Sequence, residues 1–355
     1  MYTCYWCDKP FNTYEGNTAI HFQKDIESPK KTVPLCGGCC NKIMHCAMCY
    51  NNGVYHYYPK ANMQCNKWDN TSCCPEHWDK NPSYKKIISY TQKAEKYLGF
   101  IGEPLDSLYI GVEIETEVLS TIPLAKFNDI KDIVYDLFDN FIIMKTDGSL
   151  SKYGIEIVSA PAPFDVHATA WNKFLAGQPE ALRSNCYVSG HATSCGMHTH
   201  VSRKALTVLE IGKVAYFINA IDNKQLITDI AGRYNQQYCY ISPQTKDSYK
   251  TYNLRTGKNG PEERRYNAVN TTNDNTIELR IFKGTLNPIL FMKNIEFTHA
   301  VVKFCQVVDI EQLTTKEFCT FVGINAGIYP NLVKFLVYKD HLGGVKEPDV
   351  TFKQK

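Results

Sequence analysis

Acidic, imidazole and guanidinium side chains recur in pairs, two residues apart, in three short segments of the sequence. The pairs are His198 and His200 in CGMHTHVS, Glu113 and Glu115 in GVEIETEV, and Glu278 and Arg280 in TIELRIF. Residues two apart in an extended strand point to the same face, so each pair would present both side chains together. Carboxylates, imidazoles and a guanidinium gathered on one surface can bind divalent cations and phosphates.

Two further acidic residues, Asp147 in KTDGSL and Glu156 in YGIEIVSAP, follow the first glutamate pair along the chain. Glu113, Glu115 and Glu117 would share one strand face, and clustered carboxylates repel unless cations neutralise them. Each segment alone also fits a plainer interpretation: a solvated acidic strand, a turn-forming aspartate, hydrogen-bonded or zinc-binding histidines, or an ion pair. Together the segments favour phosphoryl transfer, in which positioning and charge neutralisation supply most of the catalysis.

Cysteines mark the first part of the chain as a separate module, since ten of the 15 lie within the first 74 residues. CxxC and CxxH pairs form tight turns, and two such turns can complete a tetrahedral zinc shell. We expect two zinc ions, one held by Cys4, Cys7, Cys36 and Cys39, the other by Cys46, Cys49, Cys74 and His77. A cross-braced pairing stays open, and Cys40, Cys65 or Cys73 can replace an assigned ligand. A disulfide framework is the alternative, and it would need an oxidising compartment.

The role of this zinc module is open between folding support, protein docking and nucleic-acid contact. Four-ligand zinc sites commonly supply folding energy to a segment too small for a core of its own. Aromatic residues that could stack on bases are Trp6, Tyr55, Tyr57, Tyr58 and Trp68. Residues 1–80 contain no arginine, which disfavours phosphate binding, so structure or protein docking is the favoured role.

Composition gives no sign of a polyanionic partner or a membrane. The 355 residues carry 39 basic and 36 acidic side chains, a net charge of +3, so no strong field attracts nucleic acid or an anionic bilayer. The start MYTCYWCDKP has no signal-peptide pattern, and no apolar run reaches the roughly 18 residues of a membrane span. We therefore expect a soluble, cytoplasmic protein. Its seven arginines all lie between Arg183 and Arg280, where a planar fork for phosphate or carboxylate is expected.

Apolar spacing and turn residues divide the chain into a zinc-binding module over 1–80, a helix-containing linker over 81–107, one domain over 108–340 and a tail over 341–355. Strands are expected at 108–119, 141–145, 155–159, 197–202, 266–270 and 276–282. Helices are expected at 125–139, 168–175, 207–229, 288–306, 314–321 and 330–337. Strands in hairpin and mixed order, with helices gathered on one side, indicate an α+β fold.

These motifs, in this order, resemble a known family of enzymes. GMHTHVS is similar to the GMHxHxS strand of glutamine synthetase, and TIELRIFKGTLNP is similar to its RIExRxPD…NP segment, with Asn287 and Pro288 in the matching place. GVEIETE, DGSL…GIEIVSAP, CGMHTH and TIELRIFKGTL together resemble the phage- and bacteria-associated amidoligases, which are glutamine-synthetase-like carboxylate–amine ligases. The resemblance covers about residues 108–290. It implies a curved antiparallel sheet with helices on one side and, for a phage-encoded protein, a location in the host cytoplasm.

The resemblance also implies a role for each matching residue. The ligands of Mg²⁺ beside the ATP phosphates would be Glu113, Glu115, His198 and Glu278. Glu156 would be a further metal ligand, and His200 would contact the nucleotide. Arg280 would grip the transferring phosphoryl group or a substrate carboxylate, and Arg264 or Arg265 would bind phosphate. The synthetase's N-terminal domain, which completes a neighbouring subunit's site, is not recognisable here, so neither a ring-shaped oligomer nor ammonia is implied.

The sequence therefore predicts an ATP- and Mg²⁺-dependent ligase that joins a carboxylate to an amine through an acyl phosphate, with peptides or proteins among its candidate substrates. Asp147 or Glu156 would take the proton of the amine, because an ammonium is no nucleophile. A kinase of the same fold is the nearest alternative, and it would leave a stable phosphorylated product. The other alternative is a non-catalytic, zinc-dependent protein that binds nucleic acid or a partner protein.

Overall fold

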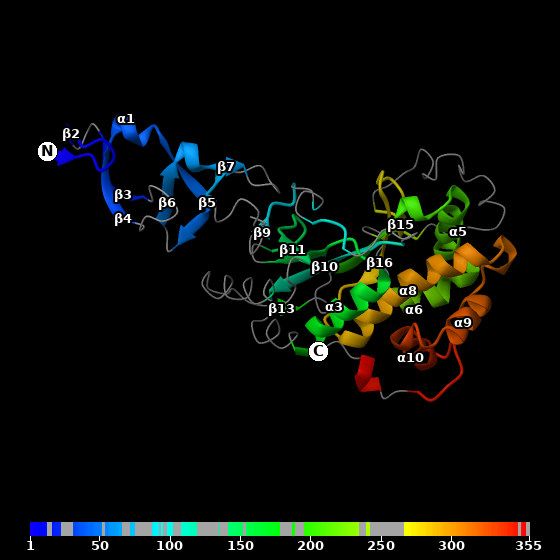
Figure 1. Cartoon of the computed structure of the whole chain (residues 1–355). Coiled ribbons are helices and arrows are strands. Elements are labelled where there is room, and N and C mark those ends of the chain that lie inside the picture. Colours follow the sequence, from blue (N-terminus) through cyan, green and yellow to red (C-terminus); the bar gives the residue numbers. More distant parts are fainter. Residues whose placement is uncertain are drawn as a thin grey trace. The chain divides into compact units, whose positions relative to one another are not determined.

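The structure is a computed structural model, and the residues it describes fall into two compact units. It describes residues 1–12, 16–22, 31–51, 54–65, 72–74, 87–91, 94, 98–101, 108–118, 134, 141–151, 154–177, 187–188, 195–233, 239–241, 266–346 and 349–352. Unit 1 comprises Met1–Lys86 and Lys93–Tyr97, and unit 2 comprises Ile87–Gln92 and Leu98–Lys355 (Figure 1). Part of the predicted linker over 81–107 thus belongs to unit 2.

Unit 1 is built around a four-stranded sheet in the order β4-β3-β6-β5. Its strands are β3 (Gly16–Phe22), β4 (Lys31–Cys36), β5 (Ile43–Asn51) and β6 (Val54–Pro59), and only β3 and β6 pair in parallel. The smaller elements are β1 (Tyr2–Thr3) paired with β2 (Pro10–Phe11), β7 (Gln64–Cys65) paired with β8 (Ser72–Cys73), the short helix α1 (Gly37–Cys40) and η2 (Lys60–Asn62).

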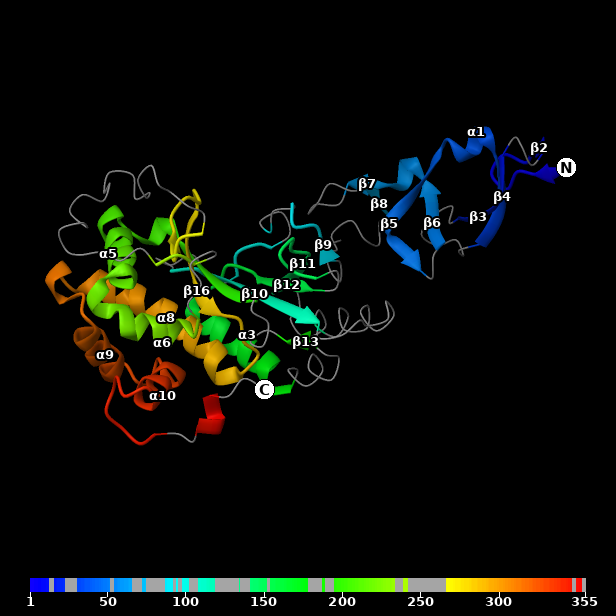
Figure 2. The same cartoon turned by 180° about the vertical axis from the view of Figure 1, so that it is seen from behind.

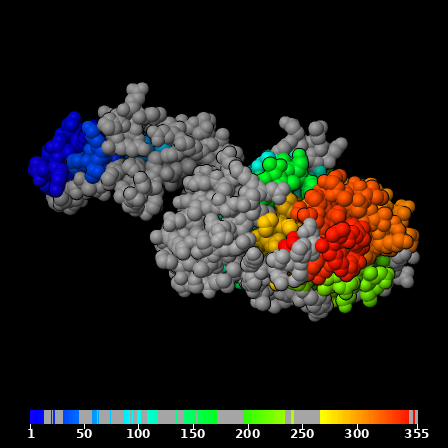
Figure 3. Space-filling model, turned by 90° about the horizontal axis from the view of Figure 1, so that it is seen from below, coloured from blue at the N-terminus to red at the C-terminus, as the bar shows by residue number. Residues whose placement is uncertain are grey.

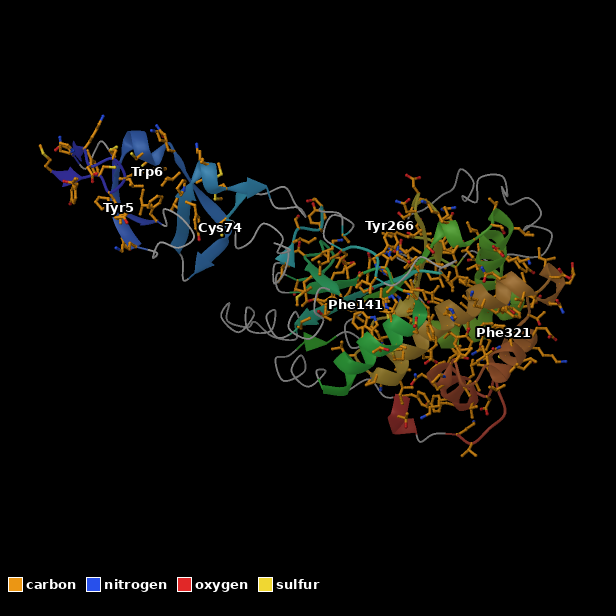
Figure 4. The ribbon with its side chains drawn as sticks, viewed as in Figure 1. Tyr5, Trp6, Cys74, Phe141, Tyr266 and Phe321 are labelled. Atoms are coloured by element: carbon orange, nitrogen blue, oxygen red, sulfur yellow. The ribbon has the colours of Figure 1, made fainter. Side chains whose placement is uncertain are left out.

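Unit 1 also contains an apolar core beside its cysteines. Phe22, Val33 and Leu35 are buried together, and Trp6 packs against them with its ring centroid 5.5 Å from that of Phe22. Figure 4 shows Trp6 and Tyr5 among these side chains. Folding support by zinc was one predicted role of this module, and the described residues supply apolar packing as well.

Unit 2 holds an eight-stranded sheet in the order β15-β16-β14-β10-β12-β11-β9, with β13 paired to the end of β10. The strands are β9 (Ile87–Ile88), β10 (Ile110–Val118), β11 (Ile142–Lys145), β12 (Ile155–Ser159), β13 (Tyr187–Val188), β14 (Gly196–Ser202), β15 (Val269–Asn270) and β16 (Thr276–Lys283). All pairs are antiparallel except β9 with β11. The resemblance implied an antiparallel sheet, and the sheet is mixed because β9, from the predicted linker, pairs in parallel with β11.

The longer helices of unit 2 are α3 (Phe164–Gly177), α5 (Val208–Asn219), α6 (Lys224–Ala231), α8 (Pro288–Val307), α9 (Thr315–Ile324) and α10 (Pro330–Tyr338). Short 3-10 turns are η4 (Arg203–Ala205), η5 (Ile221–Asn223), η6 (Ile310–Gln312) and η7 (Asp349–Phe352). The prediction of a single helix over 207–229 is wrong, because α5 and α6 are separate helices. Of the helix predicted over 125–139 the structure describes only Val134, which is helical.

Helix α8 covers one face of the sheet and leaves the other face for polar side chains. Figures 1 and 2 show α3, α6 and α8 along one side of the strands. Thr199 of β14 hydrogen-bonds to Thr298 of α8 at 2.8 Å, and Met197 contacts Asn294 at 3.3 Å. Because neighbouring strand residues point to opposite faces, His198 lies on the face turned away from α8.

The sequence Asn287-Pro288 determines where α8 begins. Asn287 is its N-cap, and the side chain accepts hydrogen bonds from the backbone N–H groups of Ile289 and Leu290. Pro288 follows at the first helical position, where its fixed φ suits the helix and its missing N–H is not needed. The Asn287–Pro288 pair therefore has a structural role in this chain.

The end of the chain packs on the C-terminal helices. Phe352 of η7 stacks on Tyr338 of α10 with ring centroids 4.3 Å apart, and Asn287 donates to the carbonyl oxygen of Thr351 at 3.0 Å. In the space-filling view the C-terminal helices, coloured orange to red, share one continuous surface (Figure 3). None of the helices in the described part of the chain combines the length and apolar character that a bilayer crossing requires.

Candidate active site

The strand register of unit 2 places the predicted polar residues on one face of the sheet. Glu113 of β10 lies opposite His198 of β14, and His200 lies opposite Glu278 of β16. On the other side of β10, Glu115 lies opposite Glu156 of β12. Four strands thus contribute to one polar surface, which is the arrangement that the two-residue spacing predicts.

Glu113 lies at the centre of this surface and contacts both histidines. Its carboxylate oxygens lie 3.5 Å from His198 Nδ1 and 3.3 Å from His200 Nε2. His198 Nδ1 also lies 3.7 Å from Glu278 Oε1. Ligand atoms of Glu113, His200 and Glu278 lie within 4.8 Å of one another, and so do those of Glu113, Glu156 and His198. The two groups share Glu113.

Charge on this surface alternates between ionised acids and imidazoles. Burial raises the pKa of Glu113, but His200 and His198 outweigh it and hold that pKa well below its usual value. Burial likewise raises the pKa of Glu278, and His200, His198 and Arg280 lower it overall. Burial lowers the pKa of His200, while Glu113 and Glu278 raise it to about 9. Glu113 and Glu278 are therefore carboxylates that a cation stabilises.

The raised pKa of Glu156 indicates that the acidic side chains of this surface are not fully neutralised by the cationic side chains around them. Burial raises the pKa of Glu156 well above its usual value, and Glu113, Asp147 and Glu115 raise it further. Lys145 of β11, with Nζ 3.3 Å from Glu156 Oε2, opposes this effect only in part. An added cation would stabilise the ionised form of such a carboxyl group.

The donor set fits a divalent cation. It combines carboxylate oxygens, which hard cations prefer, with imidazole nitrogens. His200 Nε2 is buried, and although Glu113 Oε1 lies 3.3 Å away, the nitrogen makes no well-aligned hydrogen bond among the described residues, whereas buried polar atoms are normally paired. A metal ion held by Glu113, His200 and Glu278 would satisfy that atom, and a second could use Glu113, Glu156 and His198.

Two acidic residues of the predicted site, Glu115 and Asp147, and the neighbouring Glu117 accept hydrogen bonds from backbone N–H groups. Glu115, expected to bind Mg²⁺, accepts a hydrogen bond from the backbone N–H of Gly196 and is in neither group of potential ligands. Glu117 accepts from Ser151 N at 2.6 Å, and Asp147 accepts from Ser149 N at 2.7 Å in its turn. Asp147 is still close enough to Glu156 to raise its pKa.

Arg280 lies at the β16 side of the site, between an acid and an aromatic ring. Its guanidinium donates to Glu278, and its central carbon lies 5.7 Å from the centroid of the Tyr266 ring. Tyr266 is partly exposed beside β15 (Figure 4). The ring favours a cation over its face, so the guanidinium is held in place from two directions. Arg264 and Arg265, the predicted phosphate ligands, lie outside the described residues.

Sequence reasoning missed four residues around the site. They are Lys145, Asn270, Tyr266 and Arg233. Asn270 of β15 donates to Glu278 Oε2 at 2.8 Å, and its register opposite Glu278 depends on a strand pairing that spacing does not reveal. Arg233 could have been found from the arginine enrichment between Arg183 and Arg280, because it belongs to that set.

In unit 1, one predicted zinc shell is assembled. The sulfur atoms of Cys4, Cys7, Cys36 and Cys39 lie within 4.8 Å of one another, so this group could hold zinc. Burial raises the pKa of the Cys4 thiol, but backbone N–H groups of Cys36, Cys7 and Trp6 lower it overall to about 6. Burial and the neighbouring thiols raise the pKa of Cys39. A cation among the four sulfurs would favour their thiolate forms.

The second predicted zinc shell is described only in part. Cys46 and Cys49 lie in β5, where pairing with β6 is irregular between His45 and Tyr50. Cys74 is buried, and His77 lies outside the described residues. Of the three spare cysteines, Cys40 contacts the carbonyl oxygen of Leu35 at 3.5 Å, while Cys65 and Cys73 lie in β7 and β8. The second shell stays a prediction.

Comparison with known proteins adds little to this geometry. No protein-family model and no curated protein matches the sequence. Among solved structures, the complex between the prokaryotic ubiquitin-like protein Pup and its ligase PafA is similar, with a TM-score of 0.29 and 10% identity. The match covers 70% of this chain and 60% of that chain, so less than two thirds of that chain's length is spanned. A similarity of this size does not indicate the activity of this chain.

Proposed function

We propose that unit 2 is an ATP- and Mg²⁺-dependent carboxylate–amine ligase, which forms an amide or isopeptide bond through an acyl phosphate. One observation carries this proposal: carboxylates, imidazoles and a guanidinium from neighbouring strands share one sheet face, centred on Glu113. A site of this kind can neutralise a nucleotide's phosphates and bind a carboxylate beside them. The carboxylate and the amine would be carried by small molecules, peptides or proteins.

The residues divide into a metal-binding group and an anion-binding group. Glu113, His200 and Glu278 would hold one Mg²⁺ beside the nucleotide, and Glu113, Glu156 and His198 would hold a second ion. Bound Mg²⁺ would neutralise phosphate charge and align the γ-phosphate. Arg280 has a planar fork that suits phosphate or carboxylate, and Arg264 or Arg265 would add a phosphate contact.

The reaction needs two displacements. A substrate carboxylate oxygen attacks the γ-phosphorus of ATP, the bond from phosphorus to the bridging oxygen breaks, and ADP leaves. The amine nitrogen then attacks the acyl carbon, and the carbon–oxygen bond to phosphate breaks, releasing inorganic phosphate. The amine must lose a proton in this step, and Glu156 or Asp147 would accept it.

The test measures ADP formation from Mg-ATP with hydroxylamine as a general amine, over pooled carboxylic acids, with mass spectrometry to detect hydroxamates. We expect ADP and a hydroxamate from the wild-type chain. Glu113→Gln should lower both by about 100-fold or more, because it removes a charge that the reaction's cation requires. The matched control is Glu311→Gln in η6, which changes an exposed carboxylate outside the site and should keep the activity.

Two results would count against the ligase. A stable phosphorylated acid that forms without an amine, and that hydroxylamine does not convert, would indicate a kinase instead. A wild-type chain that forms no ADP and shows no calorimetric binding of Mg-ATP would mean that unit 2 is no ATP-dependent enzyme.

A further inference from the structure

Arg233 reaches the sheet from the end of α6. Helix α6 ends at Ala231, and its C-cap Gly232 is left-handed with a φ of 66°, so the chain turns sharply and Arg233 follows immediately. Its Nη2 donates to the carbonyl oxygen of Arg280 at 2.8 Å, and its Nη1 contacts the carbonyl oxygen of Cys195 at 3.5 Å. Arg280 belongs to β16 and Cys195 directly precedes β14, so one guanidinium joins the two strands that carry Arg280 and His198.

The contact falls where the sheet's own hydrogen bonding is irregular. Between Met197 and Thr199 the β14 register shifts, and the partner on β16 changes from Phe282 to Leu279. Arg280 donates its N–H to the carbonyl of Ala268 at 2.9 Å, but the N–H of Ala268 donates to Tyr240. Arg233 therefore supplies a donor to an Arg280 carbonyl that Ala268 does not pair. Buried carbonyl groups need such partners.

Gly196 leaves the space in which the guanidinium lies. A Cβ atom at this position would be 2.7 and 2.8 Å from the terminal nitrogens of Arg233, and 3.0 Å from His198 Nε2. These distances are shorter than van der Waals contact, so any side chain here would displace Arg233, His198 or both. The N–H of Gly196 donates to Glu115, which ties β10 to the same point.

Burial of the Arg233 guanidinium disfavours its charged form, so its position has a desolvation cost. Burial lowers the pKa of Arg233, while Cys239 and Glu115 act in the opposite direction. Its Nε is buried and has no hydrogen-bond partner in the described part of the chain. A buried charge with an unmet donor is a poor source of stability, which favours a role in fixing the positions of its neighbours.

We infer that Arg233 is a positioning residue of the candidate site: it joins the start of β14 to β16 at Arg280 and so fixes the strands that carry His198 and Arg280, and Gly196 is the gap that admits it. The inference rests on the proposed function, because it assigns a purpose to the same site. Arg233 acts through backbone carbonyls, so its loss should weaken metal binding without removing a metal ligand.

The experiment titrates the full-length chain with Mn²⁺ alone and follows binding by calorimetry and by the Mn²⁺ spin-resonance signal. Glu113→Gln identifies the site by abolishing its binding. Arg233→Ala should raise the Kd for Mn²⁺ about 10- to 100-fold, as the loss of supporting contacts around a metal site commonly does. Millimolar methylguanidinium should restore part of the affinity, because it can occupy the vacated space.

Gly196→Ala should weaken Mn²⁺ binding by a similar factor, since it displaces the same guanidinium. Combined with Arg233→Ala it should add little, because residues that act through one contact are not additive. Methylguanidinium should not rescue the double variant. The matched control is Lys213→Met, which removes a buried cation that donates to the carbonyls of Cys305 and Val308 away from the site. It should lower thermal stability and leave the Mn²⁺ Kd unchanged.

Unchanged Mn²⁺ affinity in Arg233→Ala, with binding lost in Glu113→Gln, would overturn the inference and leave the proposed function standing. Fully additive effects of the two substitutions would show that Gly196 does not act through Arg233. If Arg233→Ala loses its cooperative thermal transition, Arg233→Lys takes its place. The lysine side chain is shorter than that of arginine and lacks its planar fork, so it should not reproduce both contacts, and an Mn²⁺ Kd equal to wild type would overturn the inference in that variant too. A wild-type chain without a Glu113-dependent Mn²⁺ site would remove both proposals.

Discussion

Lys293 places an ammonium group in the apolar layer beneath the sheet, far from the polar face. Only 3% of the residue is exposed. Its Nζ donates to the carbonyl of Ile230 and lies 4.6 Å from the centroid of the Phe335 ring. Burial, with a further effect from Lys339, lowers the pKa of Lys293 from 10.5 to about 7. The folded state therefore disfavours the protonated form of Lys293, whereas in the unfolded chain Lys293 keeps its ordinary pKa of 10.5.

Because Lys293 is buried, we predict that the free energy of unfolding depends on pH. Below about pH 7 the lysine is charged in both states and its desolvation cost is complete. Between pH 7 and 10.5 the unfolded chain binds a proton that the folded chain lacks, so wild-type stability rises with pH in this window. Lys293→Met should be more stable than wild type by about 2 kcal/mol at pH 6, and this advantage should shrink by pH 9.5.

Urea unfolding of both chains at the two pH values measures the difference. Lys316→Met, which replaces an exposed lysine of α9, serves as the control and should show no such trend. An advantage of Lys293→Met that is constant or grows with pH would contradict the desolvation argument.

At the residue scale, spacing predicted which side chains share a face and left their contacts unspecified. The alternation in GVEIETEV is local, so Glu113 could be placed on the polar face from the sequence. That it meets His198 and His200 depends on pairing between strands far apart in the chain. Arg233 was beyond the reach of spacing, because its approach depends on the turn at Gly232 and the gap at Gly196.

At the element scale, the hydrogen bonds of one asparagine, Asn223, accompany the break between α5 and α6, and we infer that they stabilise it. Ala220 is extended with ψ 131°, although apolar spacing continues through this point. Asn223 Nδ2 donates to the carbonyls of Phe217 and Leu313, each at 3.1 Å, and its Oδ1 lies 3.0 Å from Thr315 Oγ1. Spacing predicted one helix over 207–229, because a bond to Leu313, distant in sequence, leaves no local pattern.

Asn223→Ala should therefore destabilise unit 2. It leaves two carbonyl groups without their donor at a residue that is 1% exposed, and the expected loss is about 2–4 kcal/mol in the free energy of unfolding. Asn219→Ala is the matched control, because Asn219 donates to Ala215 within the same helix and its loss should cost about 1 kcal/mol. Equal losses in a chemical unfolding series would mean that the break does not depend on Asn223.

The strands were easier to predict than their order. Residue ranges predicted for β10, β11, β12, β14 and β16 agree with the structure to within two residues at each end, because alternation and flanking glycine or proline are local features. The parallel pairing of β9 with β11 was not predictable in this way. A two-residue strand carries almost no periodicity, and only its partner defines it.

At the scale of the whole molecule, the two units differ in what holds them together. Unit 2 buries a large apolar layer around Trp171, Phe291 and Phe297. Unit 1 has a smaller apolar cluster beside four cysteine sulfurs. Neighbouring thiolates repel one another without a cation, so zinc and apolar packing should both contribute to the stability of unit 1.

Zinc removal should consequently unfold unit 1 and spare unit 2. Zinc binding contributes about 10–16 kcal/mol in small zinc-dependent peptides, so a chelator should abolish one thermal transition and leave the other in place. Cys4→Ser should lower the zinc content by one ion per chain, and Cys74→Ser should lower it by the second ion if the other shell forms. Elemental analysis and calorimetry measure the two effects. Cys319→Ala, a buried cysteine of unit 2, is the control and should change neither the zinc content nor the transition of unit 1.

The same experiment separates zinc from its alternatives. In a disulfide framework, the oxidised chain would contain no zinc and few thiols that react under denaturing conditions, and reduction rather than chelation would remove the transition of unit 1. If the apolar cluster around Phe22 and Leu35 suffices, the zinc-free chain should keep both transitions. Because Mn²⁺ binding at Glu113 belongs to unit 2, it should survive Cys4→Ser, and its loss there would mean that the two units do not fold independently.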